Sequence, residues 1–135
     1  MIKGNKGEWS ELYVLLRLLA YGKIYAADDK VKKIENVYFP ILKIMREEVK
    51  GKKLEYRIGN NEDVEIYNND IKIKSVSREQ LKKEADYLYN EIVNMKSRSF
   101  EIEHTEKFAN DIECYRLAAP SSDKTDITMQ IHDIH

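Results

Sequence analysis

The sequence has few cysteines and glycines, and each shortage excludes a class of protein. Cys114 is the single cysteine among 135 residues, so the chain cannot form an internal disulfide and suits a reducing compartment. One cysteine and three histidines do not make a structural zinc site. The five glycines are scattered and form no phosphate-binding loop of the common types. We therefore expect a cytoplasmic protein without disulfides or structural zinc.

The chain also lacks a long hydrophobic run. Its longest apolar stretch, residues 9–21, is interrupted by Ser10, Glu11 and Arg17, whereas a membrane helix needs about 20 mostly apolar residues. The first ten residues contain no apolar segment in front of a small-residue cleavage site, so they are not a signal peptide. We therefore expect no membrane partner.

The net charge is only −1, but the charges are unevenly distributed. Residues 1–60 hold 13 Lys and Arg against 8 Asp and Glu, a balance of +5, and residues 61–135 hold 10 against 16, a balance of −6. This asymmetry fits a protein that neutralises phosphates on one side and gathers carboxylates on another. It also fits a chance arrangement, and charge alone leaves both interpretations open.

Hydrophobic spacing in the first half predicts a helix followed by a small antiparallel sheet. Residues 8–20 repeat apolar side chains at helical steps, with Gly7 before them and Gly22 as a left-handed cap. Turn residues then separate five strand-like runs, KIYAA, VYFPILKIM, KLEYRIG, DVEIY and IKIKSV. Pro40 belongs at an edge or strand start, or else opens a short helix through Arg46.

The second half predicts two helices and one more strand. Ser77 opens a helix with capping-box spacing to Gln80, and a shorter helix follows over residues 105–117, with His104 as a polar boundary residue. The last strand covers residues 126–131 and alternates polar and apolar side chains. The predicted class is therefore α+β in a single domain.

Phosphodiester hydrolysis with a divalent metal needs clustered carboxylates and a nearby cation. One widespread nuclease design places a first Asp at a strand opening and an acid-x-Lys triplet on the neighbouring strand. The chain contains three such triplets, which begin at Asp28, Glu48 and Asp70. About as many are expected by chance at this composition, and all three precede Asp126, so the triplets by themselves indicate nothing.

Two stretches carry a family resemblance. The first is residues 5–13 (NKGEWSELY) with residues 18–28 (LLAYGKIYAAD). The second, Lys124-Thr125-Asp126-Ile127, is similar to the Lys-x-Asp-Ile opening of the catalytic core in many restriction enzymes. In this order they resemble the HpaII-type restriction endonucleases, type II enzymes that cut double-stranded DNA at a short palindrome rich in C and G.

The resemblance implies a PD-(D/E)xK-like, α/β nuclease fold and Mg²⁺ as the cofactor of the complete enzyme. It divides the domain into a core helix (1–22), an inserted sheet and helix module (23–100) and the start of the catalytic core (101–135). Asp126 matches the first metal-binding, catalytic Asp, and Glu11 matches a helix-borne acid brought towards the metal. The lysines that we expect to contact DNA are Lys50, Lys52, Lys53, Lys72, Lys74 and Lys124.

The strand that should carry acid-x-Lys would come after His135, so we expect a truncated, N-terminal portion that does not cleave DNA alone. Enzymes that read palindromes are often dimers, which makes a homodimer one of the states that the resemblance suggests. The alternative function is a non-catalytic module that binds protein or nucleic acid through its small sheet and second helix.

Overall fold

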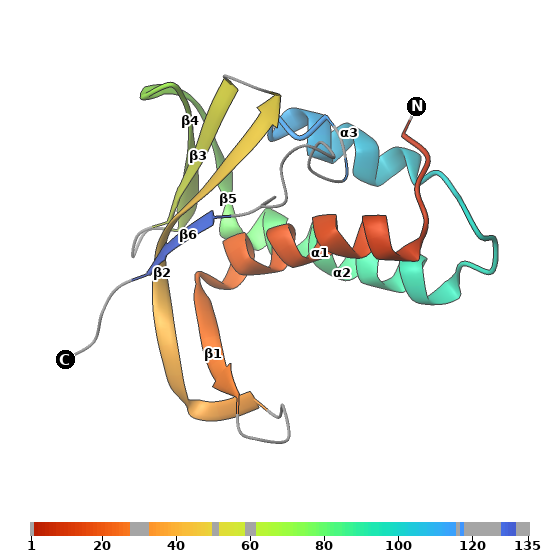
Figure 1. The fold of residues 1–135 in the computed structure, drawn as a ribbon, viewed down its shortest axis with the longest axis horizontal. Helices are drawn as coiled ribbons and strands as arrows, with labels where there is room; N and C mark the ends of the chain where they lie inside the picture. Colours follow the sequence, from red (N-terminus) through yellow and green to blue (C-terminus); the bar gives the residue numbers. More distant parts are fainter. Residues whose placement is uncertain are drawn as a thin grey trace.

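The structure, a computed structural model, contains three helices and six strands within the residues that it describes (Figure 1). Those residues are 2–27, 33–49, 52–58, 62–115, 117 and 128–131, and of 24–27, 33–40, 47–49, 52 and 128–131 only the backbone is described. The elements are α1 (Lys6–Tyr21), β1 (Lys23–Ala27), β2 (Lys33–Val49), β3 (Lys52–Ile58), β4 (Asp63–Asn68), β5 (Ile71–Ser77), α2 (Arg78–Asn94), α3 (Glu103–Asp111) and β6 (Thr128–Ile131). The predicted α+β class is confirmed, with the expected order of elements.

The strands form one sheet, and every described pair is antiparallel. Its order is β1-β2-β3-β4-β5, with β6 beside β2. The long strand β2 pairs with β1 through residues 33–40 and with β6 and β3 through residues 41–49. The strand expected to start the catalytic core therefore belongs to the same sheet as the preceding strands. The division at residue 100 stays a prediction.

The hydrophobic core lies between the sheet and the helices. Strands β3 and β4 direct every second side chain into it, and Leu54, Tyr56, Val64 and Ile66 are completely buried. The helices α1 and α2 supply Trp9, Leu12, Leu15, Leu16, Leu19, Leu81, Ala85 and Leu88. Figure 1 shows the helices on one side of the sheet. Among the described elements, none covers the opposite face.

The family motif near the N-terminus forms the start of α1. Asn5 is the N-cap: its side chain accepts a hydrogen bond from the Glu8 N–H at 2.9 Å, and the Glu8 carboxylate accepts one from the Asn5 N–H at 3.1 Å. This is a capping box, so Gly7 lies inside the helix rather than before it. The helix ends as predicted, with Gly22 in the left-handed region at φ 66°. Much of the motif thus has a structural role.

Trp9 of the same motif connects α1 to a distant segment. Its indole Nε1 donates to the Phe100 carbonyl at 3.0 Å, and the two rings stack with centroids 6.3 Å apart. The Gly4 N–H donates to the same carbonyl at 3.0 Å. These contacts hold the segment that precedes α1 in the sequence against the segment that precedes α3.

Pro40 lies within β2, so the alternative of a helix from Pro40 through Arg46 is wrong. Pro40 pairs with Lys23 of β1, and from Ile41 onward β2 pairs with β6. The proline therefore stands where one neighbour of β2 replaces another. Because proline cannot donate a ladder hydrogen bond, such a change of partner is a position where it is tolerated.

The boundaries of the later helices match the sequence pattern in one case and differ in the other. Ser77 caps α2, as predicted, and accepts from the Gln80 N–H at 3.0 Å, but the Gln80 side chain donates to Glu84 and does not complete a capping box. The third helix was expected at 105–117, but α3 begins at Glu103 and ends at Asp111. Thr105, where the helix was expected to begin, lies inside α3 and is fully buried, and the N-cap residue is Ile102. Glu113 has a left-handed φ of 67°, which is incompatible with a continuing helix.

Ile71 and Ile73 of β5 are exposed, whereas their alternation with Lys72 and Lys74 in the sequence predicts a half-buried strand; Val76 of the same strand packs partly against the core. Ile71 is 69% exposed and Ile73 is 39% exposed. Along β4 the pairing advances by one residue, from Ile66 to Tyr67, while along β5 it advances from Lys74 to Lys72. This β-bulge at Ile73 breaks the two-residue alternation on which the prediction depended. The predicted turn before β5 is present, with Asn69 and Asp70 both at positive φ.

Candidate nucleic-acid interface

The face of the sheet opposite the helices carries a set of charged and aromatic side chains. Along β3 the buried residues Leu54, Tyr56 and Ile58 alternate with side chains that point away from the core. The register then sets their neighbours, because paired residues share a face of the sheet. We call this set the polar face: Lys43, Met45, Glu47, Lys53, Glu55, Arg57, Asp63, Glu65, Tyr67, Lys72 and Ser75, of which Glu47 is placed by its backbone pairing with Lys53.

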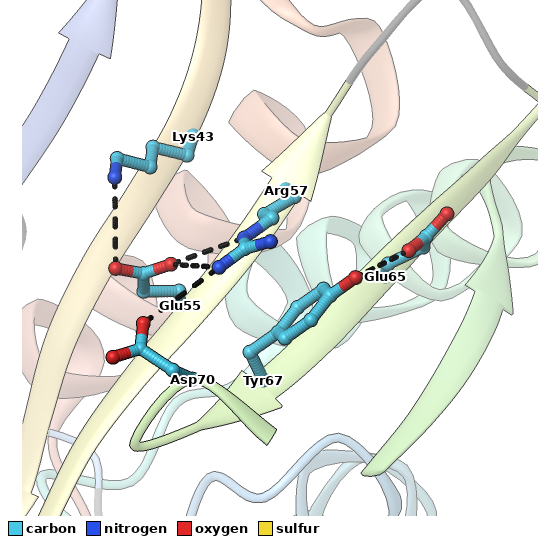
Figure 2. A network of polar contacts seen from close by, with 6 residues as sticks. All are labelled: Lys43, Glu55, Arg57, Glu65, Tyr67 and Asp70. Atoms are coloured by element: carbon cyan, nitrogen blue, oxygen red, sulfur yellow. Dashed lines mark hydrogen bonds and ion pairs between the residues drawn. The ribbon is translucent and has the colours of Figure 1, made fainter. Parts of the chain in front are cut away.

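Arg57 occupies the centre of the polar face and has contacts on several sides (Figure 2). Its Nε donates to Glu55 Oε2 at 3.1 Å, and its Nη2 lies 3.1 Å from the same oxygen. The Arg57 Cζ lies 3.6 Å from the centroid of the Tyr67 ring, a close cation–π contact. A second carboxylate, that of Asp70 at the β4–β5 turn, lies 3.8 Å from Nη2.

The neighbours of Arg57 are themselves paired. Lys43 Nζ lies 3.6 Å from Glu55 Oε1, and the Tyr67 hydroxyl donates to Glu65 Oε2 at 2.9 Å (Figure 2). Lys72 Nζ lies 3.8 Å from the same Glu65 oxygen. The network therefore crosses four adjacent strands, from β2 to β5. Exposed ion pairs contribute about 0–1 kcal/mol each, so stability alone is a weak reason for it.

The electrostatics of this face keep Arg57 charged. Partial burial acts to lower the pKa of Arg57, but the hydrogen bond and negative charge of Glu55 act against it, followed by Tyr67 and Asp70. Their sum raises the pKa above its ordinary value. Arg57 is therefore a permanent cation that is 42% exposed at its side chain.

The structure brings together some of the lysines that the sequence predicted as DNA contacts. Lys53 and Lys72 both lie on the polar face and are exposed. Of Lys52 the structure describes only the backbone, in β3, and Lys50 and Lys124 lie outside the described residues. Lys53 and Lys72 are thus the two predicted contacts that share a described surface.

Lys74 is not grouped with Lys72, although the sequence places both in one alternating run. Lys72 pairs with Tyr67 of the polar face, whereas Lys74 pairs with Ile66 of the core face. The Lys74 Nζ donates to the Asp111 carbonyl at the end of α3, at 2.5 Å. The bulge at Ile73 causes this separation.

The predicted catalytic acids are not seen together. Glu11 is exposed on α1, while Asp126 lies outside the described residues. Tyr13 contacts Tyr89 of α2, with ring centroids 5.7 Å apart. Glu11 is about 160° from Tyr13 around the helix axis, so it lies on the flank of α1 away from α2. Within the described part of the chain, no group of three or more His, Cys, Asp or Glu side chains could hold a metal ion.

A second polar cluster lies between α2 and α3. Glu84 is only 5% exposed, and its carboxylate accepts from Gln80 Nε2 at 2.9 Å and contacts His104 Nε2 at 3.0 Å. The His104 ring also packs on Tyr87, with centroids 4.5 Å apart. His104, expected to be a polar boundary residue, is therefore a partner of a buried carboxylate. The cluster joins two helices.

Beside this cluster is a hollow of about 480 Å³, whose acidic lining residues are Glu91, Glu101 and Glu103. The hydrogen bond from Tyr87 to Glu91 raises the Tyr87 pKa, with smaller contributions from burial and the charges of Glu91 and Glu84. Lys107 and His104 also line the hollow, but the three carboxylates outnumber the single ammonium group, and an acidic surface repels phosphate. The polar face is therefore the better candidate for a nucleic-acid interface.

Several residues of the polar face were missed at the level of sequence, namely Lys43, Glu55, Arg57 and Tyr67. The alternation of polar and apolar residues in Lys53-Leu54-Glu55-Tyr56-Arg57-Ile58 is a signal that could have placed Glu55 and Arg57 on one outward face. Lys43 and Tyr67 join them only through the register of three strands. No local pattern encodes that register.

The chain matches the family model described as HpaII restriction endonuclease over residues 5–135. It therefore belongs to the HpaII restriction endonuclease family, which confirms the resemblance found in the sequence. It is 37% identical over 134 residues to the type II restriction enzyme HpaII of Haemophilus parainfluenzae. This alignment covers 97% of the chain and 36% of that enzyme, so the chain spans about a third of its relative's length.

No solved structure matches the chain. The PD-(D/E)xK-like fold therefore stays a prediction. Within the residues that the structure describes, no helix is long and apolar enough to cross a membrane.

Proposed function

We propose that the chain is part of a type II restriction endonuclease that hydrolyses phosphodiester bonds of double-stranded DNA at a short palindromic site. The observation that carries this proposal is the family match over residues 5–135. Support comes from the sheet face that presents Lys43, Lys53, Arg57 and Lys72 away from the core. Lys and Arg side chains supply most of the salt-dependent affinity of proteins for DNA.

We assign Mg²⁺ as the cofactor and Asp126 and Glu11 as its ligands. Carboxylates are the protein ligands that this hard cation prefers, and two carboxylates placed together need a cation or a proton between them. The described residues hold Glu11 without a group of acids around it. The proposal for the metal site therefore depends on Asp126 and on the motif that surrounds it.

We expect the 135-residue chain to bind DNA without cutting it. Residues 127–135 contain no acid-x-Lys triplet after Asp126, and the nuclease design needs both parts of the site. Lys50, Lys52, Lys53, Lys72 and Lys124 are the lysines that we propose as phosphate contacts. Lys74 is left out because its ammonium group already donates to the Asp111 carbonyl.

Two measurements on the purified chain test the proposal. Fluorescence anisotropy with a labelled duplex should show binding that weakens steeply as salt increases. Calorimetric titration with Mg²⁺ should show a site that is lost in Asp126→Asn and weakened in Glu11→Gln, but kept in the control Glu79→Gln. Glu79 is an exposed acid of α2 that lies 3.9 Å from Lys83.

Each outcome has a distinct meaning. A chain that binds no duplex even at about 50 mM salt would refute DNA as the partner. Duplex binding together with Mg²⁺ binding that Asp126→Asn leaves unchanged would favour the alternative, a non-catalytic nucleic-acid-binding module. Plasmid nicking that needs Mg²⁺ and is lost in Asp126→Asn would support the site and contradict the expectation that this chain is inactive.

A further inference from the structure

The guanidinium of Arg57 is fixed on one edge and one face, and its remaining edge is free. Nε and Nη2 engage Glu55, Nη2 also approaches Asp70, and the Tyr67 ring covers one face. Nη1 makes no hydrogen bond to any residue that the structure describes. A guanidinium carries five N–H donors in a rigid plane, so the Nη1 donors are available to an incoming acceptor.

We propose that Arg57 is a direct DNA contact and that Tyr67 and Glu55 are its positioning residues. The acceptor is a planar or paired oxygen group of double-stranded DNA, either a phosphate or the O6 and N7 edge of guanine, both of which arginine recognises. This inference rests on the proposed function, because it names where on the chain DNA is bound.

The positions of the partners favour a preorganised contact over a simple surface ion pair. An arginine that is already held in one plane loses less conformational freedom when it binds a ligand. Tyr67 is itself fixed by its hydrogen bond to Glu65 at 2.9 Å. Glu55 is fixed from its other side by Lys43 at 3.6 Å. The residues that orient Arg57 are thus oriented by further strands.

The charges of the polar face are balanced. It carries four cations, Lys43, Lys53, Arg57 and Lys72, and four acids, Glu47 (by its backbone register), Glu55, Asp63 and Glu65. Glu55 is paired with both Lys43 and Arg57, and Glu65 with Lys72. The proposed contact therefore depends on the Nη1 donors of Arg57 and not on an excess of positive charge. Asp70 is 88% exposed and lies 3.8 Å from Arg57, a loose contact that a phosphate can replace. The described helices lie on the other side of the sheet and leave this face uncovered within the described part of the chain (Figure 1).

The test compares variants of the full chain in duplex binding by fluorescence anisotropy. Arg57→Ala should weaken binding about 10-fold or more, within the range of a lost arginine contact. Arg57→Lys keeps the charge but loses the planar fork, and we expect it to recover only part of the affinity. The control is Lys83→Ala, which removes the same charge from α2 at a side chain that is 70% exposed. It should change binding less than twofold.

Variants of Tyr67 test the positioning role, because a change in charge alone would not alter their affinity for the duplex. Tyr67→Leu removes the ring without altering any charge, and we expect binding to weaken about three- to tenfold. Tyr67→Phe restores the ring and should recover most of that loss, because the stacking surface for Arg57 returns. Thermal melting of each variant shows whether the fold is intact. If Arg57→Ala or Tyr67→Leu fails to fold, the conservative variants Arg57→Lys and Tyr67→Phe still test the contact.

Two duplexes, one rich in G and C and one of A and T only, separate the two acceptors. If Arg57 binds a phosphate, Arg57→Ala weakens both equally and lowers the salt slope by about one. If it binds guanine, the variant loses the preference for the first duplex. Equal binding by Arg57→Ala and Lys83→Ala would overturn the inference while leaving the proposed function in place. Failure of the unmodified chain to bind either duplex would instead refute the proposed function.

Discussion

Replacement of Tyr56 by phenylalanine tests how the sheet holds the segment that follows α3. Tyr56 is completely buried in β3, and its hydroxyl donates to the Ile112 carbonyl at 2.8 Å and lies 3.3 Å from Cys114 Sγ. The ring remains in Tyr56→Phe, so the core keeps its packing. What is lost is a hydrogen bond to a carbonyl of a residue that is only 1% exposed.

The expected cost follows from this burial. A typical hydrogen bond contributes about 1 kcal/mol net, but a buried acceptor left without its partner costs about 1–3 kcal/mol. We therefore expect Tyr56→Phe to lower the free energy of unfolding by about 1–2 kcal/mol. The other face of β3 carries Glu55 and Arg57, so the same strand that presents the polar face also fixes the end of α3.

Urea unfolding followed by tryptophan fluorescence measures this cost directly. Trp9 is the single tryptophan and is completely buried, so its emission reports on the core. Tyr89→Phe is the matched control, because Tyr89 is 51% exposed on α2 and should change the free energy by less than about 0.5 kcal/mol. If Tyr56→Phe proves as stable as Tyr89→Phe, the hydroxyl does not hold Ile112 and the reasoning fails.

Two further predictions concern a helix cap and a titrating hydroxyl. Gly22→Ala should lower the free energy of unfolding by about 1–2 kcal/mol in a urea titration. The reason is that Gly22 has φ +66° and that an added Cβ would lie 3.0 Å from Ile58 Cγ2 and from Arg78 Nη2. An unchanged urea midpoint would contradict this prediction. The raised pKa of Tyr87, caused mainly by its hydrogen bond to Glu91, favours the neutral phenol in the folded chain. The Tyr87 hydroxyl therefore stabilises the fold fully below its unfolded pKa of about 10, and this stabilisation is lost as pH rises through the higher folded pKa. The difference in free energy of unfolding between the chain and Tyr87→Phe should shrink as pH rises past about 10. A difference that stays constant with pH would refute this prediction.

The polar face and the predicted metal site are separate elements of the proposed function. The polar face is built from β2 to β5, whose register the structure describes. The metal site is assigned from the motif at Asp126 and from Glu11, whose helix lies on the other side of the sheet from the polar face (Figure 1). Measurements of DNA binding and of Mg²⁺ binding therefore test different parts of the chain.

Local patterns in the sequence were sufficient for most elements. The Ser77 cap, the Gly22 cap and the turn at Asn69-Asp70 depend on residues within a few positions of one another, and local chemistry dictates them. The predicted third helix extends past the observed end of α3 because the apolar spacing in the sequence continues beyond Asp111. The backbone instead turns at Glu113, at a positive φ that periodicity does not reveal.

The sequence by itself determined the family, the α+β class and the alternation that sends Glu55 and Arg57 to one side of β3. Only the tertiary structure decided which side chains meet there, because strand register depends on pairing between segments far apart in the chain. In the folded chain Lys43 and Tyr67 lie beside Glu55 and Arg57, and His104 contacts Glu84. One extra residue in β5 places Lys72 and Lys74 on opposite faces of the sheet. A bulge is a property of two strands together, and neither strand's sequence specifies it alone.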